Sequence, residues 1–125
     1  MKVLIIEDEK PAARRLSRML AALKIEAEVL LHSVEESIQW FQENKHPDLI
    51  FLDIQLSDGL SFEIFEEIAV KSAIIFTTAY DEYALKAFKL NSIDYLLKPI
   101  DEEELKVAVA KFRSQQTIIS DVNVK

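Results

Sequence analysis

The chain has 125 residues, a length that suits one domain and is too short for two. Half of its residues are hydrophobic and 30% are charged, the balance of a folded domain with a core and not of a disordered segment. The 22 acidic residues outnumber the 15 basic ones, and the net charge of -7 argues against nucleic acid or an anionic membrane surface as a partner of this domain.

The rare residue types exclude further classes of site. The chain has no cysteine, which excludes a disulfide scaffold, a thiolate zinc site and thiol catalysis, and favours an intracellular setting. Its one glycine, Gly59, is too few for the G-x-G-x-x-G dinucleotide motif or the G-x-x-x-x-G-K-S/T phosphate loop. Any phosphate group would therefore have to be held by side chains or by a metal ion.

Short apolar runs predict the strands. The first run, Val3–Ile6, leads directly into Glu7, so we expect neither a signal peptide nor a membrane span here, and a cytoplasmic protein. Similar runs, rich in Ile, Leu and Phe, suit parallel strands that are covered on both faces, and they span Leu49–Leu52, Ala73–Phe76 and Ile93–Leu97. The segment Glu28–Leu31 is typical of an edge strand, because polar and apolar residues partly alternate there.

Apolar residues spaced three and four apart predict a helix after each strand. The five sets are Leu16, Leu20 and Leu23; Val34, Ile38 and Phe41; Ile64, Phe65 and Ile68; Ala84, Ala87 and Phe88; and Leu105, Ala108, Val109 and Phe112. Pro11 suits a first helical turn, and Ser33-x-x-Glu36 and Asp101-x-x-Glu104 are typical of capping boxes. Five strand and helix pairs predict an α/β fold, an open, doubly wound, five-stranded parallel sheet with five helices on its two faces.

The helical pattern decays after Phe112. The residues that follow are polar with scattered Ile and Val. We therefore expect a frayed helix end here, with one domain over residues 1–116 and residues 117–125 beginning a linker or a flexible tail.

Polar side chains follow four of the predicted strands, at the point where each strand ends. In open α/β sheets the ligand site lies beyond the carboxyl ends of the strands. Three carboxylates, a hydroxyl and one ammonium group are therefore expected at one edge of the sheet, from Glu7, Asp8, Asp53, one of Thr77 and Thr78, and Lys98.

Most of these residues also have a purely structural interpretation. Asp8 could cap the first helix, the threonines could be ordinary strand residues, and Lys98 could be a solvated loop residue. Asp53 is harder to explain in this way, because it directly follows the buried run and would place a charge beside Glu7 and Asp8. Three close carboxylates repel one another unless a cation is present, so the sequence predicts a divalent metal.

Magnesium fits this ligand set better than zinc, because the candidate ligands are hard oxygens without a thiolate or an obvious histidine pair. A metal between Asp8 and Asp53 would also attract a phosphoryl oxygen. Lys98 would neutralise a second phosphoryl oxygen and a threonine hydroxyl would donate to a third, as phosphoryl transfer requires. Asp53, placed between metal and lysine, is the candidate nucleophile and would form an acyl phosphate.

The sequence resembles the receiver domain of two-component response regulators over residues 1–116. The motifs that carry this resemblance occur in the family's order and are Val3–Glu9, Leu49–Ile54, the Thr78–Ala79 step and Asp94–Pro99. More narrowly, Phe76–Ala84 looks like the receivers that precede a LytTR-type DNA-binding domain. The resemblance implies a flavodoxin-like fold with strand order 2-1-3-4-5.

The resemblance also implies a role for each site residue. Asp53 is then the phosphoacceptor and Lys98 the phosphate-binding lysine, with Pro99 following through a cis peptide bond. The metal ligands are then Glu7, Asp8, Asp53 and the backbone carbonyl of Gln55. Thr78 matches the switch hydroxyl, Ala79 the residue whose N–H faces the phosphoryl group, and Tyr95 the switch aromatic, for which core packing is the equally plausible structural role.

A family member of this kind is a phosphorelay switch and not a turnover enzyme. The resemblance implies Mg2+ as cofactor and a sensor histidine kinase as phosphoryl donor, followed by slow autodephosphorylation. It also implies homodimerisation on phosphorylation, for which Lys86 and Lys89 on one helix and Glu102, Glu103 and Arg113 on another offer opposite charges. The DNA-binding domain expected after Phe112 is not in this chain, so the receiver either works alone or belongs to a longer protein.

Two alternative functions fit the sequence less well than a phosphorelay switch. A phosphatase of the haloacid-dehalogenase type uses D-x-D, but here the step is Asp53-Ile54-Gln55 and the second acid is missing. A receiver-like interaction module that is never phosphorylated usually lacks one of the site residues, whereas this chain has them all. The two histidines, His32 and His46, are expected to be surface or turn residues far from the carboxylates.

Overall fold

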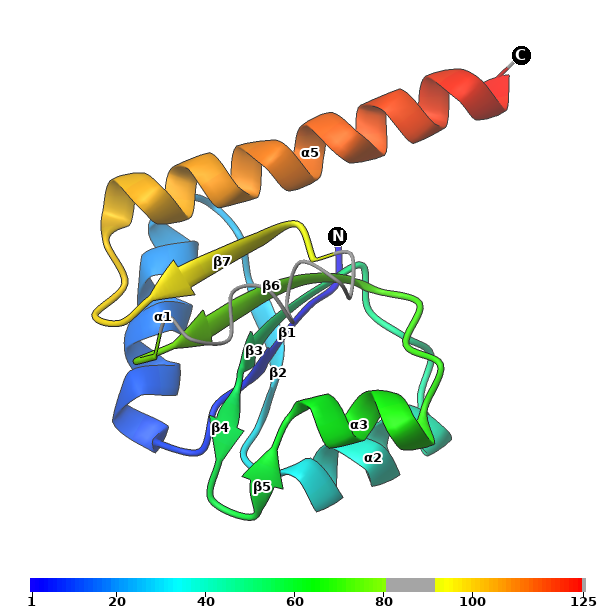
Figure 1. Cartoon of the computed structure of the whole chain (residues 1–125). Coiled ribbons are helices and arrows are strands. Elements are labelled where there is room, and N and C mark those ends of the chain that lie inside the picture. Colours follow the sequence, from blue (N-terminus) through cyan, green and yellow to red (C-terminus); the bar gives the residue numbers. More distant parts are fainter. Residues whose placement is uncertain (81–91, 125) are drawn as a thin grey trace.

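Five parallel strands form the central sheet in the computed structural model, which describes residues 1–80 and 92–124 (Figure 1). In their order across the sheet they are β2 (Ala27–Leu31), β1 (Val3–Ile6), β3 (Leu49–Asp53), β6 (Ala73–Thr78) and β7 (Asp94–Leu97). Neighbours pair in parallel, with Ile5 beside Phe51 and Phe51 beside Ile75. Counted along the chain, these five strands have the predicted order 2-1-3-4-5, and the edge position predicted for Glu28–Leu31 is confirmed.

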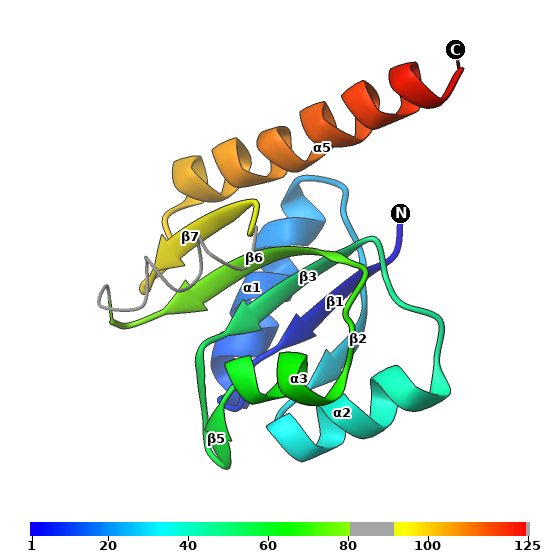
Figure 2. The same ribbon diagram turned by 45° about the vertical axis from the view of Figure 1, so that its right-hand side comes forward.

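Helices cover both faces of the sheet, as predicted (Figures 1 and 2). On one face lie α1 (Lys10–Ala22) and α5 (Glu102–Val124), and on the other lie α2 (Val34–Glu43) and α3 (Phe62–Glu67). The helix predicted around Ala84, Ala87 and Phe88 lies outside the described residues, as do Lys86 and Lys89.

Two apolar cores result, one under each pair of helices. Val3 and Ile5 of β1 pack with Leu16 of α1 and Phe112 of α5, whereas Leu4 packs on the other face with residues of α2 and α3. All four residues of β1 are buried because both of its faces are covered. This explains why the central strands appear in the sequence as continuous apolar runs.

Helix starts follow the predicted signals. Pro11 lies in the first turn of α1, and Asp101 Oδ2 accepts from the Glu104 N–H at 3.0 Å before α5. Ser33 caps α2, with its Oγ accepting from the Glu36 N–H at 3.0 Å. In a capping box the Glu36 carboxylate would return to Ser33, but it accepts from the His32 N–H instead, at 2.8 Å.

Two features go beyond the sequence predictions. A small antiparallel hairpin, β4 (Gln55–Leu56) with β5 (Gly59–Leu60), follows Asp53. In addition, α5 continues as a helix to Val124, well past the predicted decay at Phe112. Its C-terminal end extends beyond the sheet in both views (Figures 1 and 2). Within the described part of the chain, no helix combines the length and the hydropathy that crossing a membrane requires.

Candidate functional site

The predicted polar residues meet at the carboxyl edge of the sheet. Glu7 directly follows β1, Asp53 is the last residue of β3, Thr78 is the last residue of β6, and Lys98 directly follows β7. Because β1, β3, β6 and β7 are parallel neighbours, their ends deliver these side chains to one place.

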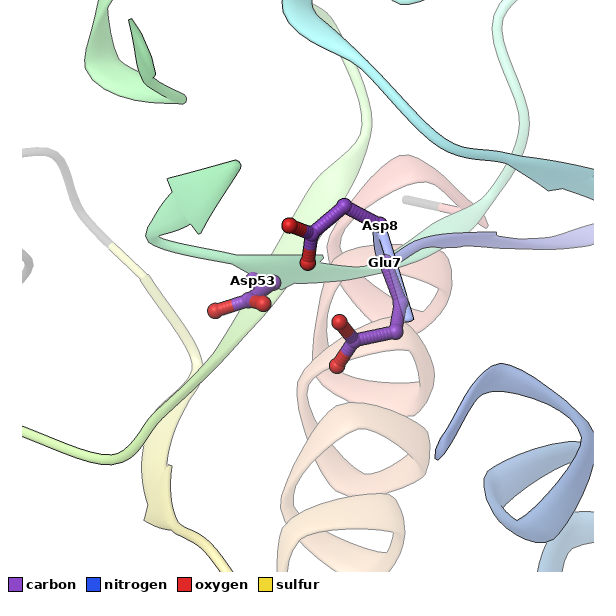
Figure 3. Close-up of side chains that lie close together, drawn as sticks. All are labelled: Glu7, Asp8 and Asp53. Atoms are coloured by element: carbon purple, nitrogen blue, oxygen red, sulfur yellow. The ribbon is translucent and has the colours of Figure 1, made fainter. Parts of the chain in front are cut away.

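Three carboxylates form the acidic part of the site (Figure 3). Glu7, Asp8 and Asp53 each offer an oxygen, and these oxygens lie within 4.8 Å of one another. Glu7 and Asp53 are only 4% exposed, and Asp8 is half-buried. The alternative role of Asp8 as a helix cap is not found, because the N-cap residue of α1 is Glu9 and no side chain caps that helix end.

Lys98 lies against two of these carboxylates. Its Nζ donates to Glu7 Oε1 and, at 2.9 Å, to Asp53 Oδ2. The backbone N–H of Lys98 donates to the Thr78 carbonyl at 2.7 Å, and the Lys98–Pro99 peptide bond is cis. Lys98 is therefore an internal counter-ion of the acidic group and not a solvated loop lysine.

The site is short of positive charge. Burial raises the pKa of Glu7, Asp8 and Asp53, and the charge of Glu7 raises the pKa of Asp8 further. Lys98 lowers the pKa of Glu7 and Asp53, but it does not fully offset burial. Burial lowers the pKa of Lys98 itself, yet its bonds to Glu7 and Asp53 outweigh this effect and raise it. One ammonium group thus serves three carboxylates, and the cluster would be further stabilised by a divalent cation.

A second group of contacts links the end of β6 to β7. Thr78 is fully buried, and its Oγ1 accepts from the Tyr80 N–H at 3.2 Å. The Tyr95 hydroxyl donates to the Tyr80 carbonyl, while the ring of Tyr95 also packs against the core under α2 and α3. Thr78 and Tyr95 are therefore joined through one residue, Tyr80, with Ala79 exposed between Thr78 and Tyr80.

The segment after Asp53 is anchored by the backbone of Ile54, the buried residue that follows Asp53. The Ile54 N–H donates to the Thr77 carbonyl at 3.0 Å, and the Ile54 carbonyl accepts from the Ser61 N–H at 2.8 Å. Gln55, whose side chain is exposed, begins β4 directly after this anchor. Its backbone is thereby held next to the acceptor strand.

The prediction that His32 lies far from the carboxylates is wrong. His32 follows β2, the parallel neighbour of β1, and its Nδ1 lies 2.8 Å from the Glu7 carbonyl oxygen. A carbonyl only accepts, so Nδ1 donates in this contact. His46 does lie elsewhere, at the amino end of the sheet, where its Nδ1 accepts from the Lys71 N–H at 3.2 Å.

Sequence reasoning missed two polar residues near the site. Arg15 of α1 donates through Nη2 to the Ile100 carbonyl at 3.2 Å, beside a cavity of about 430 Å³ that Glu7 and Lys98 also line. Asp58 lies in the turn between β4 and β5 and accepts from backbone N–H groups of α2. Asp58–Gly59 is a recognisable turn signal, but nothing local indicates which helix the carboxylate reaches.

Comparison with known proteins agrees with this geometry. The profile of the family described as "Response regulator receiver domain" matches residues 3–110. Over 121 residues the chain is 41% identical to the sensory transduction protein LytT of Bacillus anthracis, a match that covers 93% of this chain and 48% of LytT. Over 118 residues it is 37% identical to the transcriptional regulatory protein LytR of Staphylococcus aureus strain N315, covering 91% and 48% of the two chains. The chain therefore spans about half the length of these curated relatives.

A solved structure shows the same fold. The response regulatory domain of protein mrkE from Klebsiella pneumoniae superimposes with a TM-score of 0.79 at 35% identity, and the match covers 92% of this chain and 97% of that chain. The resemblance indicated by the motifs is confirmed, including its narrower likeness to LytR-type regulators. The chain belongs to the response regulator receiver domains of two-component systems.

Proposed function

We propose that this domain is a phosphoacceptor switch in which Asp53 receives a phosphoryl group from the phosphohistidine of a sensor histidine kinase. The observation that carries the proposal is the position of Asp53. It is buried at the end of β3, with Lys98 Nζ 2.9 Å from one of its oxygens and with Glu7 and Asp8 contributing oxygens to the same cluster.

The residues fit a magnesium ion. Their donors are carboxylate oxygens with raised pKa values, and the single lysine leaves negative charge uncompensated. Asp8, Asp53 and the backbone carbonyl of Gln55 would be direct ligands, and Glu7 would act directly or through water. The bound ion would supply charge neutralisation that draws a phosphoryl oxygen to Asp53.

The transfer step exchanges one bond to phosphorus for another. A carboxylate oxygen of Asp53 attacks phosphorus, the P–N bond of the phosphohistidine breaks, and its electron pair returns to the kinase imidazole, which takes up a proton from water. Lys98 leaves its two carboxylate partners in part to neutralise one phosphoryl oxygen, while the Thr78 hydroxyl and the Ala79 N–H donate to others. Water later cleaves the acyl phosphate, so the domain modifies itself and is a signalling domain without substrate turnover.

The contacts of Thr78 suggest how the phosphoryl group changes the surface. Moving the Thr78 hydroxyl toward the phosphoryl group would take away the acceptor of the Tyr80 N–H, and Tyr95 is bonded to the carbonyl of that same residue. The surface beside Tyr95 carries exposed Leu97 and Val107 around a groove of about 500 Å³. We propose that this surface pairs two phosphorylated receivers.

The cellular role follows from the relatives. LytT and LytR are roughly twice as long as this chain, and LytR is named a transcriptional regulatory protein. We infer that the receiver acts in the cytoplasm and controls a transcriptional output domain, with no contact to nucleic acid or membrane of its own. A stand-alone receiver is the alternative.

Intact mass spectrometry tests the central proposal. Incubation with Mg2+ and a small phosphodonor should add one phosphoryl group to the wild-type chain and none to Asp53→Asn. An adduct of equal amount on Asp53→Asn would refute the assignment of Asp53, and the absence of any adduct on the wild type would refute the proposed function. Light scattering then tests whether two receivers pair. A chain that stays monomeric after loading with a phosphoryl mimic would contradict pairing.

A further inference from the structure

We propose that the amino end of α2 is a brace that positions both acidic loops of the metal site, with Asp58 and His32 as the positioning residues. This inference rests on the proposed function, because it concerns how the Mg2+ ligands are held. One loop carries Glu7 and Asp8 after β1, and the other begins at Asp53, the last residue of β3, and leads into Gln55 at the start of β4. The α2 brace is the first turn of α2, residues 34–36. The Asp58 side chain joins it to the loop after β3, and His32 joins it to the loop after β1.

Asp58 connects α2 to the loop after β3. Its Oδ1 accepts from the Val34 N–H at 2.8 Å and its Oδ2 from the Glu35 N–H at 3.0 Å. The first N–H groups of a helix have no partner within the helix, and a carboxylate there also interacts favourably with the helix dipole. Asp58 thus supplies, from a separate loop, two of the bonds that the start of α2 needs.

The β4–β5 hairpin connects Asp58 to Gln55, the proposed metal ligand of this loop. Gln55 pairs with Leu60 and Leu56 with Gly59, so Asp58 lies in a two-residue turn that is closed onto β4. Strands of two residues have little stability of their own, so contacts outside the hairpin determine where it lies. Gly59 has a φ of 147°, a conformation that favours glycine and allows this tight turn.

His32 connects α2 to the loop after β1. Its backbone N–H donates to the Glu36 carboxylate in the first turn of α2, at 2.8 Å, while its ring Nδ1 donates to the Glu7 carbonyl at 2.8 Å. The ring is half-buried, so water competes only partly for this contact. The same helix end therefore reaches the backbone of a metal ligand in each loop, by routes that share no side chain.

This arrangement has a chemical consequence. Three carboxylates that repel one another would move apart unless their backbones were fixed, and Mg2+ requires near-ideal octahedral geometry. Residues that orient metal ligands from outside the ligand set typically change metal affinity 10-fold to 100-fold when they are removed. The α2 brace is expected to set the Mg2+ affinity without touching the ion.

Calorimetric titration of Mg2+ into the metal-free domain tests the brace. Asp58→Ala should weaken Mg2+ binding about tenfold, and Asp58→Asn less, since its amide oxygen still accepts one N–H. The matched control is Ser33→Ala, which removes a cap of the same helix end but no contact to either loop. We expect its affinity to stay within about twofold of wild type, because only helix stability is lost. Equal affinities for Asp58→Ala and wild type, or equal losses for Asp58→Ala and Ser33→Ala, would overturn the inference.

His32→Phe tests the second connection. The phenyl ring keeps a planar aromatic group at this position but cannot donate to the Glu7 carbonyl, so Mg2+ binding should weaken severalfold. Unchanged affinity would remove His32 from the brace.

Amide hydrogen exchange of the metal-free domain distinguishes a failure of the α2 brace from a failure of the proposed function. Exchange at Gln55 and Leu56 should rise in Asp58→Ala and stay unchanged in Ser33→Ala. If wild type fails to bind Mg2+, the proposed function is refuted while this exchange pattern still decides the brace. If wild type binds Mg2+ but the exchange pattern is identical in both variants, the brace alone is refuted.

Discussion

The two ends of the sheet carry similar residue types but use them differently. At the carboxyl end, buried Glu7 and Asp53 form an ionic group with the partly exposed Lys98, and the pKa values of all three are raised. At the amino end, Asp48 Oδ2 accepts from the Lys2 N–H at 2.7 Å, and the Asp48 N–H donates to the Lys2 carbonyl at 2.9 Å. Both Asp48 and the neighbouring Lys71 are exposed.

The difference lies in what each charge interacts with. Asp48 serves the backbone and stays in water, so it stabilises the chain at little desolvation cost. Asp53 is withdrawn from water and faces other charges, which costs free energy in the metal-free state. Buried, mutually repelling carboxylates of this kind mark a site that is completed by another charged species.

The largest effect is expected for Asp53→Asn, with Asp48→Asn as its counterpart at the amino end. Asp53→Asn should abolish phosphoryl loading, because an amide cannot act as the nucleophile. Asp48→Asn should leave the loading rate unchanged and lower the unfolding free energy by about 0.5–1 kcal/mol through a weakened backbone contact. Intact mass and urea denaturation measure the two quantities. A loading defect in Asp48→Asn would show that the ends are not functionally distinct.

Lys98→Ala should give the largest change in stability. It leaves Glu7 and Asp53 buried without their ammonium partner, so unfolding free energy at neutral pH should fall by about 1–3 kcal/mol, less than for a fully buried pair because Lys98 is partly exposed. Mg2+ should restore part of this loss, since metal binding survives. The response to phosphoryl loading, measured as dimer formation, should weaken. An unaltered response would refute the role of Lys98.

Asp8→Asn should change stability in the opposite direction. The pKa of Asp8 is raised by burial and by Glu7, and no ion pair compensates it among the contacts of the described residues. Removing its charge should raise the unfolding free energy of the metal-free domain by roughly 0.5–1 kcal/mol while Mg2+ affinity falls at least tenfold. Thermal unfolding with and without Mg2+ measures both. A variant that is both less stable and unaltered in Mg2+ binding would contradict the account of the acidic cluster.

The sequence predicted the carboxyl end well because strand ends in a parallel sheet carry their residues to one edge. Apolar runs predicted four of the five strands of the main sheet, and so placed Glu7, Asp53, Thr78 and Lys98 together, whereas partial alternation predicted the edge strand β2. The order of the strands and the residue roles came from the resemblance to a family. Spacing alone does not distinguish a solvated Lys98 from an ion-paired one.

The contacts that the sequence did not predict are those between elements distant in the chain. His32 follows β2, and only the pairing of β2 with β1 brings it to Glu7. Asp58 is separated from Val34 by 24 residues, so its capping role depends on tertiary structure. Past Phe112 the decaying pattern predicted only a frayed helix end, whereas α5 continues to Val124.

The smallest expected effect on the unfolding free energy is that of Asp58, an exposed carboxylate at the same end of the sheet as the buried ones. Burial acts to raise its pKa, but the N–H groups of Glu35 and Val34 outweigh burial, so the pKa of Asp58 lies below its usual value. Its stabilising contribution is therefore complete above the pKa of the unfolded chain and is lost as pH falls through the lower folded pKa. Solvent screens this exposed contact, so the contribution should be about 0.5 kcal/mol or less.

Urea denaturation from neutral to acid pH should show a difference between wild type and Asp58→Asn that shrinks as pH falls, whereas Ser33→Ala should differ from wild type by the same amount throughout. A constant difference for Asp58→Asn would mean that the charge of Asp58 does not contribute to stability, whereas a shrinking one shows that its ionised form is the one that the α2 N–H groups stabilise.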